Sequence, residues 1–159
     1  MPRESDEPIS LRPTQESDLE AMFALQADPV GCALAGTKPR SREVFAAEWA
    51  RNMSDPTLTS RVIVQGGTFV GAIGIFKLDG SDFIGYRIVR ERWGRGIATR
   101  AIGLIVSEVQ SRPIFAHVVA ENIASRRALE RHGFVVTASE HTPETERYLA
   151  SQTLTLELA

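Results

Sequence analysis

The chain has 159 residues, of which 43% are hydrophobic and 24% are charged. These fractions are ordinary for a globular protein and exclude bulk disorder, and the length fits a single domain over residues 1–159. The net charge of −2 argues against nucleic acid as the partner of the whole chain. A single cysteine, Cys32, excludes an intramolecular disulfide and is typical of a reducing cytoplasm.

No apolar run approaches the roughly 20 residues of a membrane-spanning helix, and residues 1–8 lack the apolar core of a signal peptide. We therefore expect a cytoplasmic protein with a flexible N-terminus over residues 1–8 and no membrane partner. The three histidines show no metal-ligand spacing, so we expect no metal site. The sequence leaves a monomer and a homodimer both open.

The first quarter of the chain predicts a short strand followed by a helix. Ile9–Pro13 alternates apolar and polar residues, as a strand does. Ser17 and Glu20 have the spacing of a capping box, so we expect a helix to begin at Ser17. The segment 28–40 contains two prolines and two glycines and is interpreted as a loop.

A second helix is expected after this loop. Ser41 is a suitable N-cap residue because its hydroxyl can accept a hydrogen bond from a free backbone N–H of the first turn. The following residues repeat at helical spacing. The expected apolar face includes Val44, Phe45 and Trp49.

The middle of the chain predicts an antiparallel meander of three strands. Gly66-Gly67 separates Arg61–Gln65 from Thr68–Leu78, which is a strong signal for a two-residue hairpin. Asp79-Gly80 turns the chain again into a strand from about Asp82 to Val89.

The last third predicts a helix from about Gly96 to Gln110, a strand over Ile114–Val119, a short helix over Ala124–His132 capped by Gly133, and two final strands near 134–139 and 153–158. The strands before and after the long helix should be parallel, since they flank a crossover helix. One face of that helix is apolar: Ala98, Ala101, Ile102, Ile105 and Val109. The predicted class is α+β, with a mixed, mostly antiparallel sheet of about seven strands.

The segment Arg92–Thr99 lies between a strand and the long helix and contains Gly94 and Gly96. A glycine-rich turn that opens a helix offers unpaired backbone N–H groups and the positive end of the helix dipole, which together bind phosphate. Five arginines and one glutamate occur between residues 87 and 100. This basic island fits a compact anionic ligand or, without any ligand, a solvated helix start.

Three phosphate-bearing ligands compete for this turn. A nucleotide-triphosphate loop needs a Gly-Lys-Ser/Thr ending, which is absent. A dinucleotide fingerprint is imitated by Gly94, Gly96 and Glu121, but Thr99 replaces its third glycine and only one βαβ unit is present. The third ligand is coenzyme A.

Two motifs together resemble the GNAT superfamily of N-acetyltransferases, and within it the ribosomal-protein N-terminal (Rim-type) branch. The first runs from Ile84-Gly85-Tyr86-Arg87-Ile88 through Trp93-Gly94-Arg95-Gly96-Ile97-Ala98, and the second joins 121–125 to 129–134. The resemblance implies the GNAT fold, with helices on both faces of a sheet that splays between its fourth and fifth strands. It also implies an acetyl-CoA-dependent N-acetyltransferase.

The resemblance assigns a role to each part of the coenzyme A site. Backbone N–H groups of the turn would hold the pyrophosphate, the end of the preceding strand would bind the pantetheine arm through its main chain, and an asparagine would fix the arm near its amide groups. In order, these residues are Trp93, Gly94, Arg95, Gly96, Ile97 and Ala98 for the turn, Ile88, Val89 and Arg90 for the strand, and Asn122 with Ser125 for the arm.

The catalytic residues are less clearly marked. Many relatives carry a tyrosine acid where this chain has Leu129, so the resemblance moves attention to Ser125 as the acid. His117 lies five residues before Asn122, near where some Rim-type relatives carry a catalytic glutamate, and histidine suits a general base. Capping roles for Asn122 and Ser125, and a structural role for His117, are the alternatives. Tyr86 is interpreted mainly as a packing residue, with lining of the acceptor site as the alternative.

Two functions are therefore weighed. The first is a transferase that moves acetyl from acetyl-CoA to a primary amine, either a protein N-terminus or a small-molecule amine. The second is a non-catalytic acyl-CoA-binding regulatory module, which Leu129 favours. The acceptor itself is not specified by the sequence.

Overall fold

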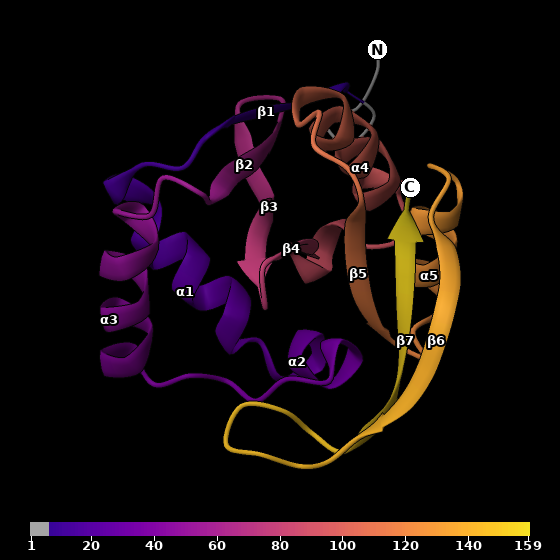
Figure 1. Ribbon diagram of the computed structural model, residues 1–159. Helices are drawn as coiled ribbons and strands as arrows, with labels where there is room; N and C mark the ends of the chain where they lie inside the picture. The colour runs from indigo at the N-terminus through magenta and orange to yellow at the C-terminus, as the bar shows by residue number, and fades with distance from the viewer. Residues whose placement is uncertain (1–6) are drawn as a thin grey trace.

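The computed structural model describes residues 7–159, which form a seven-stranded sheet in the order β1-β2-β3-β4-β5-β7-β6 (Figure 1). Neighbouring strands are antiparallel except β4 and β5, which are parallel. The α+β class and the mixed, mostly antiparallel sheet are thus confirmed. The strands are β1 (Ile9–Pro13), β2 (Thr59–Gln65), β3 (Thr68–Leu78), β4 (Ser81–Ile88), β5 (Ile114–Val119), β6 (Val135–Thr142) and β7 (Ser151–Leu158).

Five α-helices and two short 3-10 helices are present in the described residues and cover both faces of the sheet (Figure 1). Successive strand residues point to opposite faces. Val62 and Ile63 are both fully buried, but only Ile63 belongs to the main hydrophobic core. The helices are α1 (Leu19–Ala27), α2 (Pro29–Ala35), α3 (Arg42–Met53), α4 (Ile97–Glu108) and α5 (Ile123–Glu130), and the 3-10 helices are η2 (Glu16–Asp18) and η3 (Arg90–Arg92).

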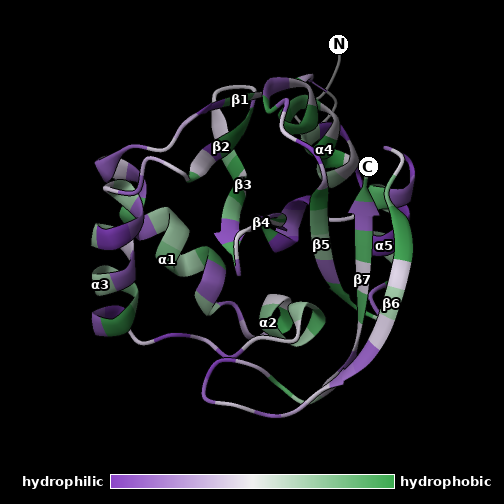
Figure 2. Ribbon diagram, viewed as in Figure 1, coloured by the Kyte–Doolittle hydropathy of each residue, from purple (hydrophilic) through white to green (hydrophobic). Residues whose placement is uncertain are grey.

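The main core lies between the sheet and the pair α4 and α5. The predicted apolar face of the long helix is confirmed at its centre, where Ala101, Ile102 and Ile105 are completely buried. A smaller apolar group on the other face joins α1, α2 and α3 to the sheet, and includes Leu25, Phe45 and Trp49. Figure 2 shows hydrophobic residues along the central strands and a mostly hydrophilic connection between β6 and β7.

Both predicted hairpin turns are present. Gly66 and Gly67 have φ of +57° and +77°, and Asp79 and Gly80 have φ of +51° and +80°. Positive φ at both central residues gives a turn whose twist matches that of the flanking strands. The register runs Gln65 opposite Thr68 and then through β3 and β4, so the three-strand meander is confirmed.

The parallel strands β4 and β5 separate soon after they begin. Their register contains two pairs, Asp82 with Ile114 and Phe83 with Phe115, whereas β5 pairs with β7 along its whole length. The main chains of β4 and β5 therefore diverge toward the carboxyl end of β4. This confirms the predicted splay between the fourth and fifth strands.

Three local predictions were wrong. The segment 28–40 is not all loop, because α2 forms within it: Asp28 accepts from the N–H of Val30 as the N-cap, Pro29 takes the first helical position, and Gly36 ends the helix in the left-handed region at φ +71°. Proline and glycine here mark the ends of a short helix. They were interpreted as loop residues because the tract between them is too short to show a periodicity.

The first capping box is also displaced. It is formed by Gln15 and Asp18 around η2 instead of Ser17 and Glu20. Asp18 takes this position because its carboxylate also pairs with Arg12, with 2.8 Å between Arg12 Nη2 and Asp18 Oδ1. The hydrogen bond from Arg12 is the main cause that lowers the pKa of Asp18. Ser41 caps α3 as predicted, but Val44 is 49% exposed and lies outside the apolar face.

Residues 1–6 of the predicted flexible N-terminus lie outside the described residues. Across residues 7–159, no helix has the length and apolar character that crossing a membrane requires.

Candidate active site

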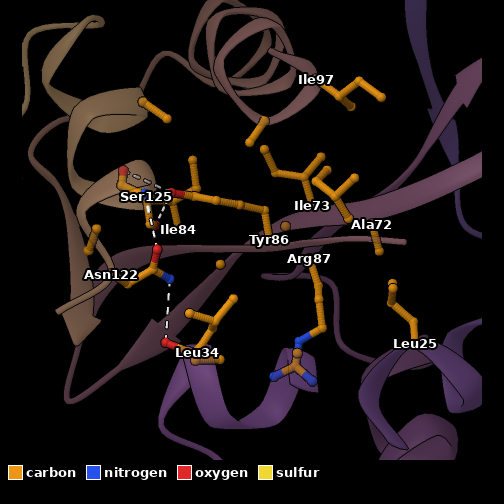
Figure 3. Close-up of a pocket in the computed structure, with 18 of the residues that line it drawn as sticks. Leu25, Leu34, Ala72, Ile73, Ile84, Tyr86, Arg87, Ile97, Asn122 and Ser125 are labelled. Carbon is orange, nitrogen blue, oxygen red and sulfur yellow. Dashed lines mark hydrogen bonds between the residues drawn. The ribbon is translucent and has the colours of Figure 1, made fainter. Parts of the chain in front are cut away.

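A cavity of about 730 Å³ opens where β4 and β5 separate. Its walls come from both faces of the sheet: α1 and α2 on one side, the start of α4 and the helix α5 on the other, and β4 and β5 between them. Figure 3 shows Tyr86 and Arg87, which are neighbours on β4, pointing to opposite sides of this space. The cavity therefore passes through the sheet, so a ligand in it can contact residues of both faces.

The glycine-rich turn forms one end of the cavity. Gly94 and Gly96 have φ of +75° and +73°, and beyond the adjoining backbone no atom lies within 4 Å of the position that a Cβ would occupy at either glycine. No side chain caps the N-terminus of α4, which begins directly after Gly96. The turn thus offers open space next to uncapped helix N–H groups, which fits a pyrophosphate.

The main chain of β4 is available along the splay. Val89 N–H donates to Val70 O at 2.9 Å, toward β3. Because antiparallel pairing alternates along a strand, the polar groups of Tyr86 and Ile88 face the opposite side, where β5 has moved away. Ile88 O accepts a 2.8 Å hydrogen bond from Trp93 Nε1, which holds the indole against the start of the turn.

Asn122 has both ends of its side chain engaged. Its Oδ1 accepts from the N–H of Ser125 at 3.2 Å, so Asn122 is the N-cap of α5. Its Nδ2 donates to Leu34 O at 3.3 Å, which ties α5 to α2 across the cavity (Figure 3). The capping interpretation of Asn122 is confirmed, and the residue also lines the cavity.

Ser125 is hydrogen-bonded to Tyr86. The phenol of Tyr86 reaches from β4 to α5, where it bonds Ser125 Oγ and donates to Ser125 O at 3.3 Å (Figure 3). Burial raises the pKa of Tyr86, while the hydrogen bond to Ser125 lowers it by less. Tyr86 therefore keeps its proton at neutral pH and is a hydrogen-bond donor inside the cavity.

His117 lines the same cavity from β5. It lies between Ala116 and Val118, which are buried in the main core, so its ring points to the opposite face of the sheet. The ring centroid is 4.6 Å from that of Phe83. Partial burial lowers the pKa of His117, and the negative charge of Glu140 raises it by less. The imidazole is mostly neutral at pH 7, as a proton acceptor must be.

Most of the residues assigned from the sequence meet at this cavity. Val89 and Arg90 are absent from its lining: Val89 packs against the main core, and exposed Arg90 pairs with Asp28 at 3.3 Å. The predicted residues that do line it are Ile88, Trp93, Gly94, Arg95, Gly96, Ile97, Ala98, His117, Asn122 and Ser125.

Tyr86 and Arg87 also place functional groups in the cavity wall, and neither was assigned to the site from the sequence. Tyr86 was interpreted mainly as packing, and Arg87 was counted only as part of the basic island. Alternation along β4 places them on opposite faces of the sheet, but only the position of α5 shows that Tyr86 meets Ser125. Within residues 7–159, no cluster of three or more His, Cys, Asp or Glu side chains could hold a metal ion, and the absence of a metal stays a prediction.

Comparison with protein families gives one match: the model described as "Acetyltransferase (GNAT) domain" matches residues 9–135. No curated protein matches the chain by sequence.

Several solved structures are similar in fold. The spermidine N-acetyltransferase from Vibrio cholerae in complex with CoA and spermine has a TM-score of 0.79 at 18% identity, covering 94% of this chain and 95% of that one. RimJ from Mycobacterium smegmatis in complex with CoA-disulfide has a TM-score of 0.72 at 25% identity, covering 96% and 82%. RimL, a ribosomal L7/L12 alpha-N-protein acetyltransferase in complex with coenzyme A, has a TM-score of 0.74 at 16% identity, covering 94% and 93%.

Proposed function

The chain belongs to the GNAT acetyltransferase family and is an acetyl-CoA-dependent N-acetyltransferase, and from this premise we propose that its acceptor is a primary amine on a protein N-terminus or a small molecule. The observation that carries the proposal is the cavity itself, which runs from the glycine turn at the start of α4, through the splay, to the face covered by α1 and α2. A donor and an acceptor can enter such a cavity from opposite faces of the sheet.

The donor half would be held by the chain as follows. Acetyl-CoA supplies an acetyl group activated as a thioester. The uncapped N–H groups after Gly96 bind its pyrophosphate, and the main chain of Tyr86 and Ile88 binds the arm as an added strand would. Asn122, already oriented by its cap to Ser125, contacts the arm from α5.

Transfer then needs an oxyanion donor and a proton acceptor. A backbone N–H of β4 in the splay stabilises the negative charge that develops on the carbonyl oxygen. His117 takes the proton that the amine loses as its nitrogen bonds the acetyl carbon, because the lowered pKa keeps the imidazole neutral. Positioning of two substrates in one cavity supplies most of the rate enhancement.

Ser125 donates a hydrogen bond to the sulfur as the carbon–sulfur bond breaks and coenzyme A leaves as the thiolate. The Tyr86 hydroxyl supports this step, since it is hydrogen-bonded to Ser125 and retains its own proton. A thiolate with a low pKa leaves without much help. Ser125 and Tyr86 therefore contribute less to the rate than His117.

An α-amine is the acceptor that this chemistry favours. Its reference pKa of about 7.7–8.0 lies far below the value of about 10.4 for lysine, so much more of it is neutral at pH 7. A site with a histidine base and no stronger one therefore acetylates an α-amine more readily than a lysine side chain.

The test is an acceptor screen that follows acetyl-CoA consumption, with mass spectrometry of a peptide that carries both a free N-terminus and an internal lysine. Acetyl found mainly on the N-terminal nitrogen supports the proposal. Acetyl found mainly on the lysine would overturn the choice of acceptor and leave the transferase activity unaffected.

A further inference from the structure

A second, smaller cavity of about 100 Å³ adjoins the large one on the face of the sheet that α1 and α2 cover. Because the pyrophosphate would lie at the start of α4 on the other face, we call this the acceptor side. The two cavities share Gln26, Arg40 and Arg87 in their walls. The small cavity lies where α2 meets the connection between β6 and β7, which is held there by Lys38 N–H donating to Arg147 O at 2.9 Å. Its full lining is polar: Gln26, Thr37, Lys38, Arg40, Arg87, Arg147 and Tyr148.

Four cations line this small cavity, and no described acidic side chain lines it. Acidic partners for three of the cations lie behind the wall: Glu48 pairs with Arg40 and lies 3.6 Å from Arg147, and Glu144 lies 3.8 Å from Lys38. Arg87 differs from them, because its contacts with the rest of residues 7–159 include no carboxylate.

The guanidinium of Arg87 is held in place by neutral groups. Its Nη1 donates to Gln26 O at 3.3 Å and contacts Cys32 Sγ at 3.5 Å, and its Nη2 donates to Thr37 Oγ1 at 2.9 Å. Figure 3 shows the side chain extending from β4 toward α2. These contacts orient the planar fork without neutralising its charge, and no contact with another described residue engages its Nε.

The acceptor side of the large cavity, like the small cavity, has no acidic side chain of residues 7–159 in its lining. Apolar side chains from α1, α2 and α3 line it, including Met22, Leu34 and Phe45. A polyamine carries several positive charges and would meet Arg87 with no carboxylate to receive it. A carboxylate would meet a pre-oriented guanidinium whose charge is not yet paired.

We infer that Arg87 and the small cavity beside it form a carboxylate subsite, and that the preferred acceptor carries a carboxylate close to its reactive amine next to an apolar body. The inference rests on the proposed function, since it concerns the acceptor of the same transfer reaction. Two sources supply this chemistry: the carboxylate of a free amino acid, and the side chain of an acidic residue next to the N-terminus of a peptide.

The experiment compares amines that differ only in the carboxylate. L-leucine, L-leucinamide and 3-methylbutylamine share an apolar body, and two C-terminally amidated peptides that begin with leucine carry aspartate or asparagine at the second position. The enzymes are the wild type, Arg87→Gln and Arg87→Lys. Arg112→Gln is the matched control, because the Arg112 side chain also donates to backbone carbonyls but lies outside both cavities.

An acid and its amide differ in the intrinsic pKa of the reacting amine, so their kcat/KM values are not compared directly. The readout is the ratio of kcat/KM for the acid to kcat/KM for its amide, compared between each variant and the wild type. Arg87→Gln is expected to lower kcat/KM for the carboxylate acceptor about 10–100-fold and to leave the amide acceptor nearly unchanged, the loss typical of one charged hydrogen-bonded contact. Arg87→Lys should retain part of the preference. Loss confined to leucine identifies a free amino acid, and loss confined to the aspartate peptide identifies a peptide N-terminus.

An equal loss for acid and amide, or no change in either, would overturn the inference, provided that the melting temperature and acetyl-CoA affinity of Arg87→Gln match those of Arg112→Gln. If Arg87→Gln does not fold, competition settles the question with the wild type. In that case 4-methylpentanoate should inhibit competitively against the amine, whereas 4-methylpentanamide should not, and equal inhibition by both would overturn the inference. No turnover with any amine would instead overturn the proposed function, and this inference with it.

Discussion

Tyr86 on β4 and Ser125 on α5 are 39 residues apart in sequence, yet their hydroxyl groups are hydrogen-bonded inside the cavity. The bond joins the strand whose main chain borders the splay to the helix that Asn122 caps. Because burial raises the pKa of the phenol, Tyr86 remains protonated over the whole neutral range. We therefore expect the pair to act as one unit, in which Tyr86 holds the Ser125 hydroxyl in place.

The first prediction follows from this pairing. Ser125→Ala and Tyr86→Phe should each lower kcat about 10-fold, below the roughly 10²–10⁴-fold range for general acid–base groups, because the thiolate is a good leaving group. The double variant should lose little more than either single one, since residues that act as a unit are not additive. The measurement is steady-state kinetics with saturating acetyl-CoA.

Ser107→Ala is the control, because Ser107 is exposed on α4 and donates only to Gly103 O in its own helix. It should retain the wild-type kcat. Multiplicative losses in the double variant would show that Tyr86 and Ser125 act independently.

The second prediction concerns the glycine turn. Gly96→Asp places a negative charge and a side chain where we expect the pyrophosphate, so acetyl-CoA affinity in calorimetry should fall below detection. Part of any loss could come from the backbone, because Gly96 has φ +73°. Gly67→Asp controls for this, since Gly67 has φ +77° and equally open space but lies in the hairpin between β2 and β3.

Both aspartate variants should lose similar stability, and only Gly96→Asp should lose the ligand. Equal acetyl-CoA affinity in the two variants would remove the turn from the binding site. NADH should not raise the melting temperature of the wild type, whereas acetyl-CoA should, because a ligand that binds only the folded state stabilises it.

The third prediction tests the contact between α4 and the turn that follows α5. Glycine inside a helix usually gains about 1 kcal/mol of stability when replaced by alanine. At Gly103, however, a Cβ would lie 2.7 Å from Cε1 of His132, whose Nε2 is 2.6 Å from Thr99 O. Overpacking costs about 1–3 kcal/mol, so Gly103→Ala should lower the free energy of unfolding by about 1 kcal/mol.

The sign should reverse once the imidazole is removed. In a His132→Ala background, Gly103→Ala should raise the free energy of unfolding by up to about 1 kcal/mol. Urea denaturation followed by circular dichroism gives all four values of this cycle. A loss of stability in both backgrounds would show that something other than the His132 ring opposes the new methyl group.

Sequence alone predicted the elements that depend on local patterns. The Gly-Gly and Asp-Gly turns gave the meander because they require positive φ at defined positions. The stripe on α4 was predicted because its periodicity is long enough to be unambiguous. The helix α2 was missed because its seven residues show no stripe. The position of the capping box depends on Arg12 of β1, whose guanidinium donates two hydrogen bonds to the carboxylate of Asp18.

The coenzyme A site was predicted through two motifs, and the structure brings most of their residues to one cavity. What sequence could not supply is the set of contacts between distant segments. Arg87 meets Thr37 only because α2 folds against the sheet, and the small cavity exists only because the connection between β6 and β7 packs against the end of α2. Such contacts depend on tertiary packing, and no spacing in the chain encodes them.

The last prediction concerns the proton acceptor. Partial burial lowers the pKa of His117 below its ordinary value of 6.5, and the charge of Glu140 opposes this shift. If His117 is the base, its protonation adds a further loss of rate as the pH falls below about 6.5, beyond the loss that protonation of the acceptor amine causes. His117→Ala should lower kcat about 10²–10⁴-fold at pH 7. Glu140→Gln removes a charge that favours the protonated ring, so it should move this acidic limb to lower pH.

The comparison between Glu140→Gln and the wild type isolates the enzyme group, because the ionisation of the acceptor amine is the same in both assays. Glu130→Gln is the control, since Glu130 pairs with Arg126 on the surface of α5. The charge of Glu130 is not among the causes of the shift in the pKa of His117. It should leave the limb in place. The idea is contradicted if the acidic limb does not move in Glu140→Gln and His117→Ala keeps the wild-type kcat. His117 would then have a structural role beside Phe83, and water would accept the amine proton.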